Sequence, residues 1–403
     1  MEQRAASEIV KEFLPLLRKF ENDAAFTITE ASEEPGSKVG DNYMSQVIRT
    51  KVIGKRGNGS HYSKSFMSKN FLPNPALVEM ARTHHLFENE SHVYNNILPI
   101  LGDFGPKCIF ANGKKIILED LREYGYVLAK REEFLDFNHI VWTFKTLARL
   151  HAKSLAWKLK DPRGFDELVA PLKEVPYPAD SGQSIGKTTN FTIKFAIQQL
   201  KQLETQTEEI EHAVKILESY EAPCYEILQG LLNQPREKSH VLNHGDSWIN
   251  NILFKYDAEG QIIDLKLIDY QIVRLGSPAL DFHYFTYANV KSSFIEQHYD
   301  VLVLIYHHLF EEQMREQNIP EEFIDQLTLQ WFKDELKKYS FFGLVSGIAL
   351  VHAVVADETD VIDMTTVNLE EMLNSEIFTA PPLVPKKANR IKTIVLHYIR
   401  AFL

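Results

Sequence analysis

The spacing of apolar residues changes once along this chain, near residue 119, and that change limits the folds open to it. Before this point apolar and polar residues alternate in three runs, separated by turns that contain Gly and Asn. Alternation is typical of strands with one buried face, so the runs predict an antiparallel meander. The three strands are expected over residues 25–34, 43–54 and 62–72. A helix over residues 74–96 and strands over 107–111 and 115–118 should follow.

Beyond residue 119 the pattern is largely helical. The main exception is a predicted hairpin with strands over residues 252–256 and 262–268. A small sheet carrying one helix, followed by a large helical region, predicts an α+β chain of two domains, residues 1–120 and 121–403. A chain of 403 residues is also too long for one compact core. We expect a ligand in the cleft between two such lobes.

Charge and hydropathy exclude several classes of protein. Acidic residues outnumber basic ones by 55 to 44, and the sequence pI is near 5.8. Such a balance argues against a broad surface for nucleic acid or anionic membrane. The most apolar stretch, residues 341–356, is shorter than the roughly 20 residues that cross a bilayer, so it predicts a buried core helix. Two cysteines make no disulfide framework, so the cytoplasm is the default expectation for the compartment. The oligomeric state is not indicated by the sequence, and a monomer is assumed.

The strongest chemical signal is the run His244-Gly-Asp-Ser-Trp-Ile-Asn-Asn251, followed by the hairpin and then Ile268-Asp-Tyr270. Phosphoryl transfer needs a carboxylate to orient and deprotonate the attacking hydroxyl, and oxygen ligands for the Mg²⁺ that bridges the nucleotide phosphates. Asp246 and Asn251 are five positions apart in one loop and can serve as base and metal ligand. The hairpin should return Asp269 beside them as a second ligand. Protein kinases have Arg in place of Gly245.

The upstream half of the chain supplies a candidate nucleotide site. Lys69 lies late in the third predicted strand, and Glu90 lies 21 residues later in the predicted helix. A strand lysine held by a helix glutamate is the kinase arrangement for contacting the α- and β-phosphates of ATP. Lys64 is the rival lysine, but an odd number of positions separates it from Lys69. It should therefore project from the opposite face of the strand.

Two further segments have candidate roles. The loop over residues 36–45 joins the first two strands, where backbone N–H groups would cover phosphates, although a plain hairpin turn is the alternative. Asp281 could accept hydrogen bonds from the catalytic loop and hold its shape. A simple helix N-terminal residue is the equally weighted alternative for Asp281.

The order and spacing of these motifs resemble the ecdysteroid kinase-like (CHK-type) family, which is related to choline kinases and aminoglycoside phosphotransferases. The resemblance rests on Phe87-Glu-Asn-Glu90-Ser-His-Val-Tyr94, Ile117-Leu-Glu-Asp-Leu121, Leu147-Ala-Arg-Leu-His-Ala152, His244-Gly-Asp-Ser-Trp248 with Asn251, and Leu267-Ile-Asp-Tyr-Gln271. It spans about residues 35 to 285.

The resemblance implies a two-lobed protein-kinase-like fold, use of ATP and Mg²⁺, and phosphorylation of a small-molecule hydroxyl group. It also implies a hinge at residues 118–121, with Glu119 and Leu121 meeting adenine through backbone groups. In the phosphate loop the chain keeps Gly40, Asp41, Asn42 and Tyr43 of the family pattern and little else. His244 and Asp281 would support the catalytic loop.

Two other functions fit less well. A protein kinase needs a peptide-displaying activation segment, and only twelve positions separate Asp269 from Asp281. A nucleotide- or hormone-binding pseudokinase remains the alternative, although base, metal ligands and the Lys–Glu pair are all present. The acceptor regions, residues 157–238 and those after Asp281, are rich in Phe, Tyr, Leu and Ile with few fixed charges. They favour an apolar alcohol, such as an ecdysteroid-like steroid or a lipophilic xenobiotic, over choline.

Overall fold

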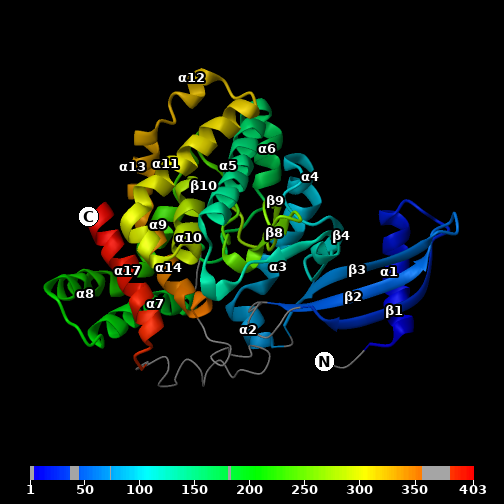
Figure 1. Ribbon diagram of the computed structural model, residues 1–403, viewed down its shortest axis with the longest axis horizontal. Helices are drawn as coiled ribbons and strands as arrows, with labels where there is room; N and C mark the ends of the chain where they lie inside the picture. The colour runs from blue at the N-terminus through cyan, green and yellow to red at the C-terminus, as the bar shows by residue number, and fades with distance from the viewer. Residues whose placement is uncertain (1–3, 37–44, 73, 180–182, 356–381) are drawn as a thin grey trace. The chain divides into compact units, whose positions relative to one another are not determined.

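The computed structural model describes residues 4–36, 45–72, 74–179, 183–355 and 382–403. These residues form two compact units. The first takes its described residues from Met1–Val127 and Leu253–Ile268, and the second from Leu128–Ile252, Asp269–Val361 and Val367–Leu403. Most of the strands labelled in Figure 1 belong to the first unit and most of the helices to the second.

The first unit is built on a five-stranded antiparallel sheet in the order β1-β2-β3-β5-β4. Its strands are β1 (Thr27–Pro35), β2 (Gln46–Lys55), β3 (His61–Asn70), β4 (Cys108–Asn112) and β5 (Lys115–Glu119). All five strands were predicted from the sequence, three of them from alternation, and their ends are displaced by at most three residues. The pattern works here because one face of the sheet is covered and apolar while the other carries polar side chains.

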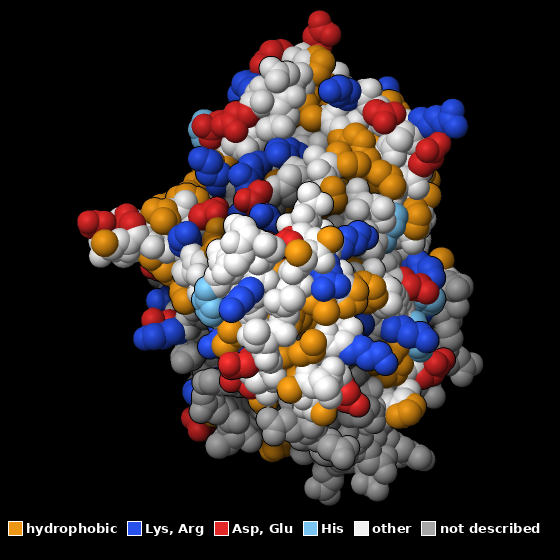
Figure 2. Space-filling model, turned by 90° about the vertical axis from the view of Figure 1, so that its right-hand side faces the viewer, with side chains coloured by type: hydrophobic (Ala, Val, Ile, Leu, Met, Phe, Trp, Pro, Cys, Tyr) orange, Lys and Arg blue, Asp and Glu red, His pale blue; other side chains and the backbone are white. Residues whose placement is uncertain are grey.

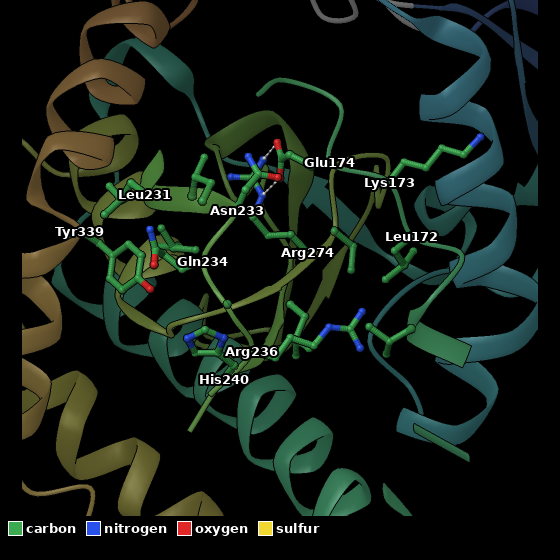
Figure 3. A pocket seen from close by; sticks show the side chains of 16 residues that line it. Leu172, Lys173, Glu174, Leu231, Asn233, Gln234, Arg236, His240, Arg274 and Tyr339 are labelled. Atoms are coloured by element: carbon green, nitrogen blue, oxygen red, sulfur yellow. Dashed lines mark hydrogen bonds and ion pairs between the residues drawn. The ribbon is translucent and has the colours of Figure 1, made fainter. Parts of the chain in front are cut away.

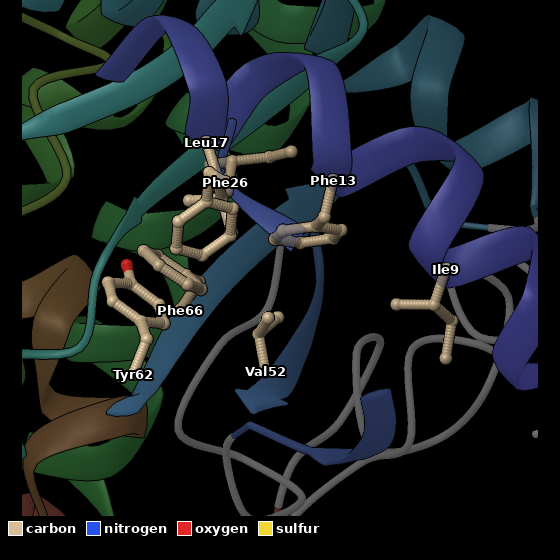
Figure 4. Close-up of a cluster of buried hydrophobic side chains, with 8 residues drawn as sticks. Ile9, Phe13, Leu17, Phe26, Val52, Tyr62 and Phe66 are labelled. Carbon is tan, nitrogen blue, oxygen red and sulfur yellow. The ribbon is translucent and has the colours of Figure 1, made fainter. Parts of the chain in front are cut away.

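Helix α1 (Ala6–Phe20) covers one face of this sheet. Ile9, Phe13 and Leu17 recur every four residues and therefore share one side of the helix. They pack against buried side chains of the sheet and its approach, of which Figure 4 labels Phe26, Val52, Tyr62 and Phe66. Ile117 belongs to the same cluster. Phe13 and Phe66 have ring centroids 5.8 Å apart. This packing fixes which face of β3 is buried under α1 and which is free to carry a functional side chain.

The helix predicted over residues 74–96 is wrong as one continuous element. The structure has α2 (Pro75–Met80), α3 (Thr83–His92), a π-helical turn (Val93–Ile97) and α4 (Leu98–Leu101). Arg82 causes the break, because its φ of +52° lies in the left-handed region and cannot continue a right-handed helix. Glu90 nevertheless remains on a helix, α3, which contacts β4 and β5.

A second sheet, in the order β6-β8-β9, combines β6 (Tyr126–Leu128) with the predicted hairpin. The hairpin strands are β8 (Ile252–Tyr256) and β9 (Ile262–Leu267), as expected to within one residue. Leu121, Tyr126 and Leu253 pack together as a small apolar cluster of the first unit. β6 was not predicted, because three residues are too few to display a period.

The second unit is mainly helical. Its larger helices are α5 (Phe137–Lys160), α6 (Pro162–Val169), α7 (Gln183–Lys201), α8 (Glu208–Glu221), α9 (Cys224–Leu232), α10 (Ala279–Asn289), α11 (Ser292–Glu316), α13 (Leu329–Lys338), α14 (Ser340–Val354) and α17 (Pro385–Phe402), with a short α12 (Glu321–Ile324). Two three-residue strands, β7 (Val241–Asn243) and β10 (Arg274–Gly276), pair antiparallel. They were also missed, for the same reason as β6.

Helix α10 is the centre of the second unit, because every one of its residues is buried. It packs closely on α14, where Gly343 and Gly347 replace side chains at the contact. A Cβ at Gly343 would lie 2.8 Å from the His283 ring, and one at Gly347 would lie 2.8 Å from the Tyr287 Cβ. The apolar stretch at residues 341–356 is thus a core helix over its described part, as predicted.

The surface shows little segregation of charge. On the face drawn in Figure 2, Lys and Arg side chains are interspersed with Asp and Glu side chains. Nowhere in the described part of the chain is a helix both long enough and apolar enough to span a bilayer.

Candidate functional site

The loop that carries Asp246 follows β7 and has an unusual backbone. Gly245 has a φ of +84°, and a Cβ there would lie 2.2 Å from the carbonyl oxygen of Ile272. Only glycine fits both the left-handed conformation and this close approach. The Gly that this sequence has in place of the protein-kinase Arg is therefore a steric requirement of the loop.

Asp281 holds the same loop from α10. Its two carboxylate oxygens accept hydrogen bonds from the backbone N–H of His244 (2.7 Å) and of Gly245 (2.8 Å). His151 of α5 adds a third contact, with its Nε2 3.0 Å from Asp281 Oδ2. Asp281 is thus a residue of the first turn of α10 that also accepts hydrogen bonds from the loop backbone. The predicted loop-supporting role and the alternative of a helix N-terminal residue are therefore compatible. Sequence reasoning gave no role to His151.

The electrostatics of this cluster favour a charged carboxylate. Complete burial alone would raise the pKa of Asp281, but the His151 hydrogen bond and charge, the His244 charge and the Gly245 N–H together outweigh it and lower the pKa. His151 in turn shares its Nδ1 with the hydroxyl of Tyr306 at 2.6 Å. The loop is therefore anchored to α5, α10 and α11 through one buried polar network.

The Asp246 carboxylate is itself held by side chains. Tyr284 of α10 donates its O–H to Asp246 Oδ1 at 2.5 Å, and Gln271 Nε2 lies 3.4 Å from Oδ2. Asn251 donates its side-chain N–H to the backbone oxygen of Asp246 at 2.9 Å. Asp246, Asn251 and Gln271 are all at least nine-tenths buried. The structure thus brings Asp246 and Asn251 into direct contact and adds Tyr284 and Gln271, which the sequence analysis did not assign.

Asp269 follows β9 and is half-buried, with a φ of +67°. A non-glycine residue in this left-handed region is uncommon, and Asp is one of the few types that adopt it. Such conformations concentrate where a side chain must point in one required direction.

The donor set of these residues suits magnesium. Because the amide nitrogen of Asn251 is bonded to Asp246, its carbonyl oxygen is the atom left for a metal. This oxygen and the Asp269 carboxylate are hard donors of the kind that Mg²⁺ binds, and Mg²⁺ commonly takes few protein ligands and completes its shell with water and phosphate oxygens. Within the described residues, no group of three or more His, Cys, Asp or Glu side chains gathers as an all-protein metal cluster.

The first unit places the predicted lysine and glutamate together. Lys69 Nζ of β3 donates to Glu90 Oε2 of α3 at 2.6 Å, and both side chains are buried. The Lys69 ammonium also lies 5.8 Å from the centroid of the Phe87 ring. Lys64 instead contacts Glu21 and Glu119, at 3.5 and 3.7 Å, on the α1 face of the sheet. The two lysines thus point to opposite faces of the sheet, as expected for residues an odd number of positions apart in one strand.

The predicted hinge residues surround a buried carboxylate. Glu119 Oε1 accepts a hydrogen bond from Tyr124, and Leu121 belongs to the apolar cluster of β6 and β8. Between them Asp120, 1% exposed, accepts from Arg49 Nε at 2.6 Å and from Arg122 Nε at 3.0 Å. The role of Asp120 was not predicted. Gly40, Asp41 and Asn42 of the predicted phosphate loop lie outside the described residues.

A cavity of about 250 Å³ opens beside β10 in the second unit. Figure 3 shows Arg274 at its wall, paired with Glu174, with Arg236 and His240 nearby. None of its lining residues is among the site residues predicted from the sequence. One of its lining residues influences the catalytic loop: the Arg274 charge partly opposes the burial that raises the pKa of Tyr284, whose hydroxyl is bonded to Asp246.

Comparison with known proteins identifies the chain's relatives. Residues 39–319 match the model of the ecdysteroid kinase-like family. Similar solved structures include a Plasmodium vivax ethanolamine kinase (14% identity, 93% of this chain and 90% of that one, TM-score 0.41). They also include a Brachybacterium faecium macrolide 2′-phosphotransferase (11%, 86% and 99%, 0.35) and a streptomycin–ATP–APH(2″)-IIa ternary complex (14%, 91% and 97%, 0.34). A search of the curated proteins finds no match.

The family match covers well over half of the chain and includes every motif from the phosphate loop to Asp281. It confirms the resemblance drawn from those motifs. The two-lobed, kinase-like α+β fold and the small-molecule kinase class expected from the sequence are confirmed with it.

Proposed function

Because this chain belongs to the ecdysteroid kinase-like family, we propose that it uses ATP and Mg²⁺ to phosphorylate a hydroxyl group of a small, largely apolar molecule. The observation that carries the proposal is the catalytic loop. Asp281 fixes its backbone, and Asp246 is presented with its carboxylate hydrogen-bonded and its backbone tied to Asn251. Such an arrangement suits a base that must meet one hydroxyl in one direction.

The residues divide the reaction between them. Asp246 accepts the proton of the acceptor hydroxyl as its oxygen attacks the γ-phosphorus, and the bond from that phosphorus to the β,γ-bridging oxygen breaks to release ADP. Asn251 and Asp269 would hold the Mg²⁺, which would neutralise charge on the phosphates when bound. Lys69, oriented by Glu90, would contact the α- and β-phosphates. Glu119 and Leu121 would meet adenine.

The surroundings of Asp246 favour an uncharged acceptor. Tyr177 and Arg274 are both within electrostatic range of Tyr284, the partner of Asp246. The rings of Tyr177 and Phe342 are 6.5 Å apart, and the Arg274 guanidinium lies 5.5 Å from the Phe342 centroid. Arg274 is neutralised by Glu174 at 3.0 Å. A cationic acceptor would need surplus carboxylates or an aromatic cage open to it, whereas the Phe342 ring already faces the Arg274 guanidinium and Glu174 is already paired. This arrangement suits an uncharged, ring-containing alcohol.

The proposed acceptor is therefore an ecdysteroid-like steroid or a lipophilic xenobiotic. Two free cysteines, Cys108 and the buried Cys224, fit a reducing compartment such as the cytoplasm.

Transfer of labelled γ-phosphate to a panel of steroid and xenobiotic alcohols tests the proposal, with nucleotide binding measured in parallel. Asp246→Asn should lower turnover by roughly 10²–10⁴-fold while ATP binding stays close to wild type. Asp166→Asn, which changes an exposed carboxylate of α6, is the matched control and should have wild-type turnover. Nucleotide binding without turnover by the wild type on any acceptor would instead support the pseudokinase.

A further inference from the structure

Helix α10 contacts the catalytic loop at three successive points. Asp281 accepts from the backbone of His244 and Gly245, Tyr284 donates to the Asp246 carboxylate, and Asn289 donates to the Ser247 oxygen at 2.8 Å. Asp281 and Tyr284 are three positions apart and are neighbours on one face of the helix, and Asn289, five positions further on, lies about 140° round the axis from Tyr284. The two outer contacts fix the backbone, whereas the middle one acts on a reacting group.

We propose that Tyr284 is a positioning residue that orients the Asp246 carboxylate towards the acceptor hydroxyl. This inference rests on the proposed function, in which Asp246 is the base. The Tyr284 hydroxyl donates to Oδ1 at 2.5 Å, and the Gln271 amide nitrogen lies 3.4 Å from Oδ2. The shorter contact, from α10, is the one that fixes the direction of the carboxylate.

Tyr284 can act only as a donor. Burial, the neighbouring Asp246 charge and the hydrogen bond to that carboxylate raise the pKa of Tyr284 well above its ordinary value. The phenol therefore stays protonated over the working pH range, and it donates a charge-assisted hydrogen bond that stabilises ionised Asp246.

The other charged and titratable groups around this pair are few among the described residues. His244 accepts the backbone N–H of Asp246 through Nδ1 at 3.2 Å, and Tyr177 and Arg274 act on Tyr284 from the loop after α6 and from β10. Arg274 is paired with Glu174. The phenol is thus the one side chain of α10 with a hydrogen bond to the Asp246 carboxylate in the described structure.

Tyr287 is a matched control on the same helix. It is buried, one turn further along α10, and its hydroxyl is bonded to His397 Nδ1 at 2.8 Å instead of to the loop. Tyr→Phe at either position removes one buried hydroxyl and leaves the ring in place. The two variants therefore differ in what the hydroxyl contacts and in little else.

The test is the split between kcat and KM for an accepted alcohol. Tyr284→Phe should lower kcat by roughly tenfold, because the carboxylate loses the hydrogen bond that orients it, while KM for the alcohol and for ATP should not change. Tyr287→Phe should keep the wild-type kcat. A wild-type kcat in Tyr284→Phe, or the same fall in both variants, overturns the inference.

Two further measurements separate the possible failures. Tyr284→Met, which also lacks the hydroxyl but fills similar space, should show the same fall in kcat and covers the case in which the Phe variant does not fold. Wild-type turnover in Asp246→Asn would refute the proposed base, and with it the function. Loss of turnover in Asp246→Asn with a wild-type kcat in Tyr284→Phe would refute only the role of Tyr284.

Discussion

His151 and Asp281 are 130 positions apart in the chain, yet Nε2 of one lies 3.0 Å from Oδ2 of the other, with both side chains fully buried. The contact joins α5 to the first turn of α10. Because Asp281 also accepts from the backbone of His244 and Gly245, the shape of the catalytic loop depends on the core of the second unit. A change at this contact should therefore affect stability and catalysis together.

Asp281→Asn should destabilise the protein by on the order of 3 kcal/mol, because it removes a buried charge and turns one acceptor into a donor that faces other donors. Urea unfolding at pH 7 measures the loss. Asp166→Asn, at an exposed position, should change the free energy of unfolding by less than about 0.5 kcal/mol. Equal stability of the two variants would contradict the anchoring role.

The same contact predicts a pH dependence of stability. The pKa of Asp281 is lowered in the folded protein, so the unfolded chain binds the proton more tightly. The stabilisation is therefore fully present above the unfolded pKa of about 3.9 and is lost as pH falls through the lower folded value. The difference in unfolding free energy between wild type and Asp281→Asn should shrink below about pH 4 and stay constant from pH 5 to 7.

Lys69→Met should lower turnover by on the order of 10²-fold, since a cation aimed at the phosphates is lost. It should also destabilise the first unit, because Glu90 is left buried without its partner. The double variant Lys69→Met/Glu90→Gln should recover most of the stability and none of the turnover. Lys64→Met, on the α1 face, should resemble wild type in turnover. Recovery of activity in the double variant would show that the Lys69–Glu90 pair acts on stability and not on the phosphates.

Asp269 allows charge and backbone conformation to be separated. Its φ of +67° is tolerated by Asn and Gly but is strained for Ala. Asp269→Asn and Asp269→Gly should thus be similar in thermal stability, and Asp269→Ala less stable by about 1 kcal/mol. All three should lose Mg²⁺-dependent nucleotide affinity, because the carboxylate ligand is gone. Unchanged affinity in the Asn variant would remove Asp269 from the metal site.

The strands of the five-stranded sheet were predictable because α1 buries one face and leaves a clean alternation. The central helix gave no such signal. Every residue of α10 is buried, so its sequence has no polar face to mark Tyr284 as special, and its contact with Asp246 spans 38 positions. The burial of Asp120 had no sequence signal either, since only the fold brings Arg49, 71 positions away, onto it. The break at Arg82 has no sequence signal, because Arg rarely adopts a positive φ.

The last prediction concerns the acceptor. Burying about 300 Å² of an apolar ligand at roughly 25 cal/mol per Å² contributes on the order of 7 kcal/mol before association costs, enough for micromolar binding without an ion pair. Hydroxylated steroids should therefore compete with one another for turnover, and millimolar choline should be neither substrate nor inhibitor.

A variant at Tyr177, which is within electrostatic range of Tyr284, tests the same point from the protein side. Tyr177 is half-buried, and an acceptor that packs on its ring as proposed would lose about 60 Å² of contact when the ring is removed, which corresponds to roughly a tenfold change in affinity. Tyr177→Ala should raise KM for a steroid alcohol by about that factor and leave KM for ATP unchanged. Tyr124→Ala, in the first unit, is the matched control and should leave the steroid KM unaltered. Efficient phosphorylation of choline by the wild type would refute the apolar acceptor while leaving Asp246 as the base, because the transfer step is the same for any hydroxyl.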